Sequence, residues 1–155
     1  MLFERIFHFV AVMLVCFGMV AHAQAESTDQ VRAFADSAAD LILKDQRDSL
    51  YELFAPSLRQ AYDRKELLAP MELIQTMYGR LLSHEFRTLS QGWREVSGRR
   101  IKIVQYAYAV ATSRYPTGRF MNVQVTYEEG RFYLAGYSVV QFIGTEEPSF
   151  LKRTQ

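Results

Sequence analysis

Residues 101–142 decide the fold, and they read IKIVQYAYAVATSRYPTGRFMNVQVTYEEGRFYLAGYSVVQF. Three runs rich in β-branched and aromatic residues alternate here with two turn-forming segments, Pro116-Thr117-Gly118 and Glu129-Gly130. This pattern is typical of three antiparallel strands joined by tight turns. A more polar run, residues 84–91, precedes them and is compatible with an edge strand, so the sheet is expected to have about four strands.

The residues upstream predict helices that cover this sheet. A capping box of Ser27 and Gln30 begins the first helix, whose apolar stripe is Val31, Phe34, Ala35, Ala38, Leu41 and Ile42. Asp36 and Asp40 are expected to point away from the core. A short second helix follows Asp48. A third helical pattern runs from about Lys65 to Leu82, and Pro70 inside it favours a start at Pro70, because proline is favoured in the first turn. The predicted fold class is α+β, with three N-terminal helices packed on one face of a curved antiparallel sheet.

The register of the strands can be derived from the two turns. A two-residue turn at Pro116-Thr117 would place Tyr108 opposite Val125, and a turn at Glu129-Gly130 would place Val125 opposite Leu134. Both assumptions put the bulky residues of the three strands on one face, which the helices would cover. A bulge at either turn would shift one strand and change its assignment.

The covered face is expected to hold a small space. Gly136 and Ser138 would lie there, opposite Val123 and Met121, where larger side chains are otherwise the rule. Two interpretations remain open: a helix side chain fills the space as ordinary core, or it is an apolar pocket for a small apolar ligand. The candidate pocket residues are Tyr106, Tyr108, Val123, Tyr127, Gly136 and Ser138.

The other face mixes alanines and amides with larger apolar side chains. It is too apolar for a solvated sheet and too polar for a buried one, which favours a homodimer or a protein-partner interface. The alternative is an ordinary surface with a few exposed aromatics. The candidate interface residues are Phe120, Tyr133, Tyr137 and Val139.

The N-terminal sequence predicts export. Residues 1–25 combine a weakly basic start, an apolar run and two small-residue cleavage sites, after Ala23 and after Ala25. We therefore expect a cleaved signal peptide, a domain over residues 26–144, a flexible tail over residues 145–155, and a periplasmic or secreted location. The alternative is that residues 1–23 are retained as a membrane anchor.

Composition excludes several kinds of site in the mature chain. Removing residues 1–25 removes the one cysteine and leaves His84 as the remaining histidine. No metal site is expected from such a chain, since structural zinc needs Cys and His clusters, and a Cys nucleophile is absent. A net charge of +1 offers no electrostatic footprint for nucleic acid. No cofactor is expected.

Helices followed by a curved sheet, together with the closing pattern in residues 129–137, EGRFYLAGY, resemble the nuclear transport factor 2-like (cystatin-like cone) superfamily. The ending looks like that of small exported bacterial domains of unknown function in this superfamily. The resemblance implies a cystatin-like half-cone with a conical pocket and frequent dimerisation through the sheet. It also implies functions that range from isomerases to non-catalytic subunits.

Three functional hypotheses follow. The first is a non-enzymatic binding or interaction module. The second is an isomerase or dehydratase; this needs a carboxylate base, which the pocket-facing strand positions lack, unless Asp63, Glu66, Glu85 or His84 reaches in. A buried carboxylate near Tyr106 or Tyr108 would favour it. The third hypothesis, with residues 1–23 retained, is a membrane-anchored domain similar to the periplasmic part of type IV secretion core components.

Overall fold

A computed structural model describes residues 28–96 and 98–141. A boundary between two compact units falls after Ala33, inside the first helix, and each unit is considered by itself. The described residues form four helices: residues 28–43, α2 (Arg47–Glu52), α3 (Pro56–Ala61) and α4 (Arg64–Tyr78). They also form four strands: β1 (Leu81–Val96), β2 (Arg99–Thr112), β3 (Arg119–Glu128) and β4 (Arg131–Gln141).

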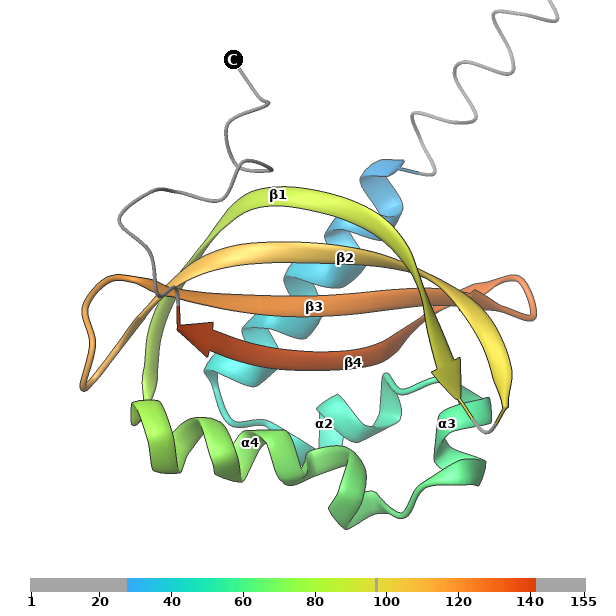
Figure 1. The fold of residues 1–155 in the computed structure, drawn as a ribbon, viewed down its shortest axis with the longest axis horizontal. Coiled ribbons are helices and arrows are strands. Elements are labelled where there is room, and N and C mark those ends of the chain that lie inside the picture. The colour runs from blue at the N-terminus through green and yellow to red at the C-terminus, as the bar shows by residue number, and fades with distance from the viewer. Residues whose placement is uncertain (1–27, 97, 142–155) are drawn as a thin grey trace, which may run out of the picture. The chain divides into compact units, whose positions relative to one another are not determined.

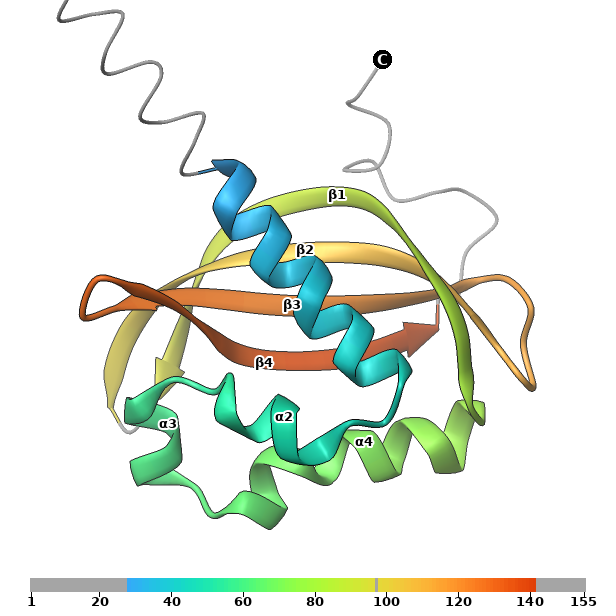
Figure 2. The same cartoon turned by 180° about the vertical axis from the view of Figure 1, so that it is seen from behind.

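The strands form one antiparallel sheet in the order β1-β2-β3-β4 (Figure 1). The predicted α+β class and the four-stranded antiparallel sheet are therefore confirmed. Helix residues 34–43 cross one face of the sheet (Figure 2). Most of their buried side chains are small, with Ala35, Ala38 and Ala39 each 0% exposed, which lets the helix approach the strands closely.

The edge of β4 is covered by the connection between α2 and α3. Leu134 donates its backbone N–H to Leu53 O at 2.7 Å, and Ala55 donates its own to Leu134 O at 3.0 Å. These two bonds satisfy backbone groups that an edge strand would otherwise expose. They also hold α3 beside the turn between β3 and β4.

The expectation of three helices is wrong, because the segment after Pro56 forms a helix of its own, α3. The preferred start of the last helix at Pro70 is also wrong: α4 begins at Arg64, close to the start of the apolar pattern near Lys65, and Pro70 lies inside it. Asp63 explains the earlier start. Its carboxylate accepts the Glu66 N–H at 2.8 Å, while the Glu66 carboxylate accepts the Asp63 N–H at 2.9 Å, a capping box that begins the helix six residues before the proline.

The predicted pairing of β2 with β3 is wrong by four residues. Tyr108 pairs with Met121, because the connection between these strands is longer than a two-residue turn. Thr112 closes it early: its Oγ1 accepts the Tyr115 N–H at 2.9 Å, and its N–H is donated to Tyr115 O at 2.8 Å. A shift of four residues leaves every side chain on its predicted face, since faces alternate with a period of two.

The pairing of β3 with β4 is confirmed near the turn and wrong beyond it. Tyr127 pairs with Phe132 and Val125 with Leu134, as predicted from Glu129-Gly130. A register shift between Gln124 and Val125 then moves the rest of β4 by one residue. A one-residue shift exchanges the two faces, so the second half of β4 is inverted relative to the prediction.

The first strand is also longer than predicted. β1 spans Leu81–Val96 and pairs with β2 over its whole length, with register shifts at Leu81/Ser83 and Phe86/Thr88. The expected signal peptide, Ser27 and the C-terminal tail lie outside the described residues. Among those that are described, no helix is both long and apolar enough to cross a membrane.

Candidate functional site

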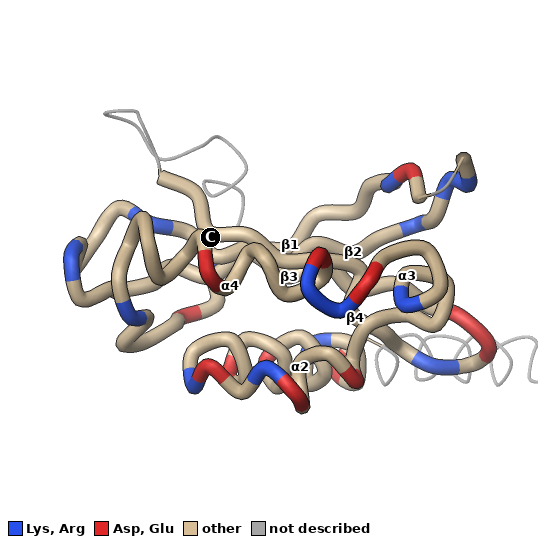
Figure 3. Tube along the Cα trace, turned by 90° about the horizontal axis from the view of Figure 1, so that it is seen from below, with Lys and Arg blue, Asp and Glu red and all other residues tan. Residues whose placement is uncertain are grey.

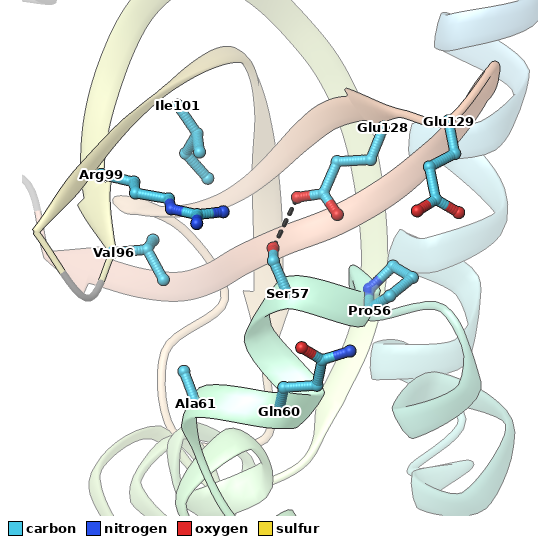
Figure 4. Close-up of a pocket in the computed structure, with 9 residues that line it drawn as sticks. All are labelled: Pro56, Ser57, Gln60, Ala61, Val96, Arg99, Ile101, Glu128 and Glu129. Atoms are coloured by element: carbon cyan, nitrogen blue, oxygen red, sulfur yellow. Dashed lines mark hydrogen bonds between the residues drawn. The ribbon is translucent and has the colours of Figure 1, made fainter.

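A hollow of about 730 Å³ lies between α3, the end of the β1–β2 hairpin and the turn of the β3–β4 hairpin (Figure 4). Its volume falls within the range of small-molecule sites. It is lined by Pro56, Ser57, Gln60 and Ala61 of α3, by Val96 and the β2 residues Arg99 and Ile101, and by Glu128 and Glu129 at the turn between β3 and β4. Gln60, Ala61, Arg99 and Glu129 are exposed, so the hollow opens to solvent.

Short-range contacts hold the walls of this hollow in place. Pro56 occupies the first turn of α3, directly after Ala55, whose N–H is bound to β4. Ser57 Oγ donates a hydrogen bond of 2.6 Å to the Glu128 carboxylate, which joins α3 to the end of β3. On the opposite wall, Val96 and Arg99 are paired across the end of the β1–β2 hairpin. The walls therefore come from elements that are bonded to the sheet.

The charges in the hollow are separated. Among the described residues, the side chains of Arg99 and Glu129 have no hydrogen-bond or ion-pair partner. Figure 4 shows them on opposite sides of the Ser57–Glu128 hydrogen bond, with Val96 and Ile101 on the wall from which Arg99 extends. Seen from below, the basic and acidic positions of the whole domain are interspersed (Figure 3). The hollow thus offers one cation and two carboxylates beside an apolar surface.

A second polar cluster joins helix residues 34–43 to the sheet. Tyr108 donates its hydroxyl proton to Asp36 Oδ1 at 2.8 Å, and His84 Nε2 lies 2.8 Å from Asp40 Oδ1. The rings of His84 and Tyr108 meet edge to face with centroids 5.2 Å apart. The hydrogen bond from His84 lowers the pKa of Asp40 from its usual value, with a smaller contribution from Lys44.

The expectation that Asp36 and Asp40 point away from the core is therefore wrong. The buried stripe of the helix runs through Ala35, Ala38, Ala39 and Ile42, while Phe34 and Leu41 are only half-buried. The helix is therefore rotated about its axis relative to the predicted orientation, and the flank that carries Asp36 and Asp40 lies toward β1 and β2. The sequence pattern missed the rotation because alanine carries little hydrophobic weight in a periodicity argument, yet it allows the closest helix-to-sheet contact.

The six candidate pocket residues do not converge in the structure. Tyr106, Tyr108 and Val123 share one face, as predicted, and are 1%, 0% and 0% exposed. Tyr127 is on the same strand as Val123 but is 62% exposed. The placement of Gly136 and Ser138 opposite Val123 and Met121 is wrong, because a bulge in β4, where Ala135 has no partner on β3, pairs Val123 with Tyr137 and Met121 with Val139.

Gly136 instead lies under a side chain that comes from β1. A Cβ atom at Gly136 would overlap Nη1 of Arg94, which donates to Ala135 O at 2.5 Å and to Gln124 Oε1 at 3.1 Å. The small residue therefore accommodates a guanidinium that links β1 to β3 and β4. Gly136 pairs with Gln124 and so lies on the opposite face from the predicted space, where Arg94 occupies the room beside it.

The four candidate interface residues are divided between the faces. Phe120 and Tyr133 are half-buried on the face away from helix residues 34–43, as predicted. The placement of Tyr137 and Val139 with them is wrong: the same bulge turns both inward, where they are 7% and 9% exposed. Within the described residues, the Tyr137 hydroxyl has no hydrogen-bond partner, although the backbone of Met71 lies near it, and burial raises its pKa.

Sequence reasoning missed the hollow because its residues come from turns. In the sequence, Arg99 belongs to a basic pair before a strand, which could hold an anion but is usually a solvated turn, and Glu129 belongs to a turn-forming pair. Glu129 does have the left-handed backbone that such a turn requires, with φ of 49°. No local pattern shows that α3 lies against both hairpin ends, since that proximity depends on the bond between Ala55 and Leu134.

Over residues 28–96 and 98–141, no group of three or more His, Cys, Asp or Glu side chains is placed to hold a metal ion. Comparison of the chain with protein-family models, with curated proteins and with solved structures finds no match. The hollow and the cluster of Asp36, Tyr108, Asp40 and His84 are therefore the two features of the described residues from which a function can be inferred.

Proposed function

We propose that this protein is an exported, non-enzymatic binding module, and that its ligand or a segment of its partner enters the hollow between α3 and the hairpin ends. The observation that carries the proposal is a pair of opposite charges, Arg99 and Glu129, at a hollow of about 730 Å³; their side chains have no partner among residues 28–96 and 98–141. An exposed charge without an ion-pair partner costs little free energy, because water solvates it. The convergence of two such charges on one concave, partly apolar site is typical of ligand recognition.

The proposal differs from the sequence-based hypothesis in the location of the site. The pocket is no longer placed under the helices, where Tyr106 and Tyr108 are fully packed. A half-cone of the nuclear transport factor 2-like type is retained as a proposal for the fold family, supported by the order of helices and strands. Export and signal-peptide cleavage are retained as proposals that rest on residues 1–25.

Native mass spectrometry of the protein, purified from its own exported compartment without refolding, tests this function. We expect a discrete added mass or a co-purifying partner. Ala61→Trp, which places an indole in the mouth of the hollow, should abolish it. Leu73→Trp is the matched control, because Leu73 is 58% exposed on α4 and does not line the hollow. The proposal is contradicted if the wild type and both variants all show only the mass of the unliganded chain, or if Ala61→Trp keeps the added mass.

A second candidate function is a proton-transfer enzyme of isomerase or dehydratase type. The hydrogen bond between Tyr108 and Asp36 favours it, since a carboxylate beside a tyrosine hydroxyl can supply a base and a donor. The candidate is weaker because Tyr108 is 0% exposed and neither residue lines the hollow. An added mass that is lost in Tyr108→Phe but kept in Ala61→Trp would reverse this preference.

A further inference from the structure

We propose that the hollow binds a short zwitterionic peptide, with its carboxylate at Arg99 and its ammonium group at Glu129. This inference rests on the proposed binding function and names the chemical class of its ligand. It follows from the charges, the apolar wall and the size of the hollow.

The charges of the hollow specify a ligand that carries both signs. Its lining holds one guanidinium, Arg99, and two carboxylates, Glu128 and Glu129. A purely anionic ligand would be attracted by Arg99 but repelled by the two carboxylates nearby. A ligand with a carboxylate at one end and an ammonium group at the other matches both sides, because Arg99 and Glu129 lie on opposite sides of Glu128 (Figure 4).

Arg99 and Glu129 differ from Glu128 in their hydrogen bonding. One oxygen of Glu128 is already bound to Ser57 Oγ at 2.6 Å, so this carboxylate is part of the wall. The side chains of Arg99 and Glu129 have no partner within the described part of the chain, so a ligand that binds them displaces no bond recorded there. Arginine suits a terminal carboxylate, because its planar fork can donate two parallel hydrogen bonds.

Part of the lining beside the charges is apolar. Val96, which is 4% exposed, and the half-buried Ile101 form part of one wall, and Pro56 and Ala61 belong to the other. Aliphatic contacts of this kind accept small apolar side chains without selecting a single shape. A volume of about 730 Å³ accommodates a ligand larger than a single amino acid, which is why a short peptide is proposed.

The test uses the mature protein and a pool of randomised tripeptides with free termini. Native mass spectrometry should detect captured peptides, and N-acetylated or C-amidated pools should be captured at least about tenfold less. Arg99→Gln and Glu129→Gln should each reduce capture of the free pool by a similar factor. Arg100→Gln is the matched control: it removes a neighbouring guanidinium that stacks over Trp93, 5.2 Å from the ring centroid, and should leave capture unchanged.

The outcomes separate this inference from the proposed function. Equal capture of free and blocked pools overturns the zwitterion inference but leaves the hollow as a binding site if Ala61→Trp abolishes capture. No capture of the free pool also overturns the inference, while an added mass on the exported protein that is lost in Ala61→Trp upholds the site. Capture that Ala61→Trp does not affect overturns both. A thermal melt of each variant confirms that it is folded.

Discussion

Gly136 shows how one residue without a side chain can hold two distant strands together. Arg94 extends from β1, and its guanidinium lies over Gly136 while it donates to Ala135 O and Gln124 Oε1. A glycine within a strand normally weakens the strand, because it loses more backbone entropy on folding than other residues and has no side chain to pack. Here the absent Cβ leaves space for a guanidinium that donates hydrogen bonds to both β3 and β4.

Replacing Gly136 by alanine should therefore destabilise the protein by about 1–2 kcal/mol, because Arg94 must move and give up its hydrogen bonds. In an Arg94→Ala background the same change should be neutral or slightly stabilising. Chemical denaturation of the four proteins measures this coupling. Gly92→Ala is the control, since its added Cβ would meet only Ile103 at 4.0 Å. Additive effects of the two changes would contradict the role assigned to Arg94.

Tyr137 illustrates the cost of a buried hydroxyl. Because its oxygen is buried with no hydrogen-bond partner among the described residues, Tyr137→Phe should be neutral or stabilising by up to about 1 kcal/mol. Burial raises the Tyr137 pKa, so the unfolded chain loses this proton first, and stability should fall as pH rises above about 10.

Thermal melts from pH 7 to 11 test this prediction. The Phe variant should lose less stability than the wild type over the alkaline part of that range. Tyr127→Phe is the control, because Tyr127 is 62% exposed. Identical alkaline profiles for the wild type and Tyr137→Phe would show that the hydroxyl at position 137 is not the group responsible.

At the scale of elements, polar contacts join helix residues 34–43 to the strands. Asp40 is bonded to His84 on β1, and Asp36 is bonded to Tyr108 on β2. The carboxylate of Asp40 is half exposed, so the contribution of this contact to stability is screened by solvent. Its effect should appear as a dependence on pH.

Asp40→Asn should lower stability near neutral pH, and the difference from the wild type should shrink in acid. The pKa of Asp40 is lowered in the folded state, so its contribution is present above the ordinary aspartate pKa of 3.8 and is lost as pH falls through the lower, folded value. Denaturation from pH 2 to 7 measures this, with the exposed Glu95→Gln as control. A difference that stays constant across this range would exclude the His84–Asp40 contact as its source.

For the whole molecule, we predict that a signal peptide is cleaved from the N-terminus. The small residues at Ala21, Ala23 and Ala25 predict cleavage that leaves Gln24 or Glu26 at the N-terminus. N-terminal sequencing of the exported protein should find one of these two residues. Intact Met1 in the membrane fraction would instead favour the retained anchor.

The local sequence determined the fold class and much of its detail. Runs of β-branched and aromatic residues specify strands, and Glu129-Gly130 specifies the hairpin register of Tyr127 with Phe132, as observed. The faces of β2 and β3 were also predictable, even though the turn between them was misjudged, because a shift of four residues preserves alternation. These features depend on neighbours in the chain, which the sequence displays directly.

Only the tertiary structure decided which residues form a site. The register shift at Gln124/Val125 exchanges the faces of the second half of β4. It thereby buries Tyr137 and places Gly136 beside the guanidinium of Arg94. The docking of Ala55 on Leu134 brings α3 against both hairpins, so that Arg99 and Glu129, about 30 positions apart, face the same hollow. Such proximities arise from packing between distant segments, and local propensity and periodicity carry no information about them.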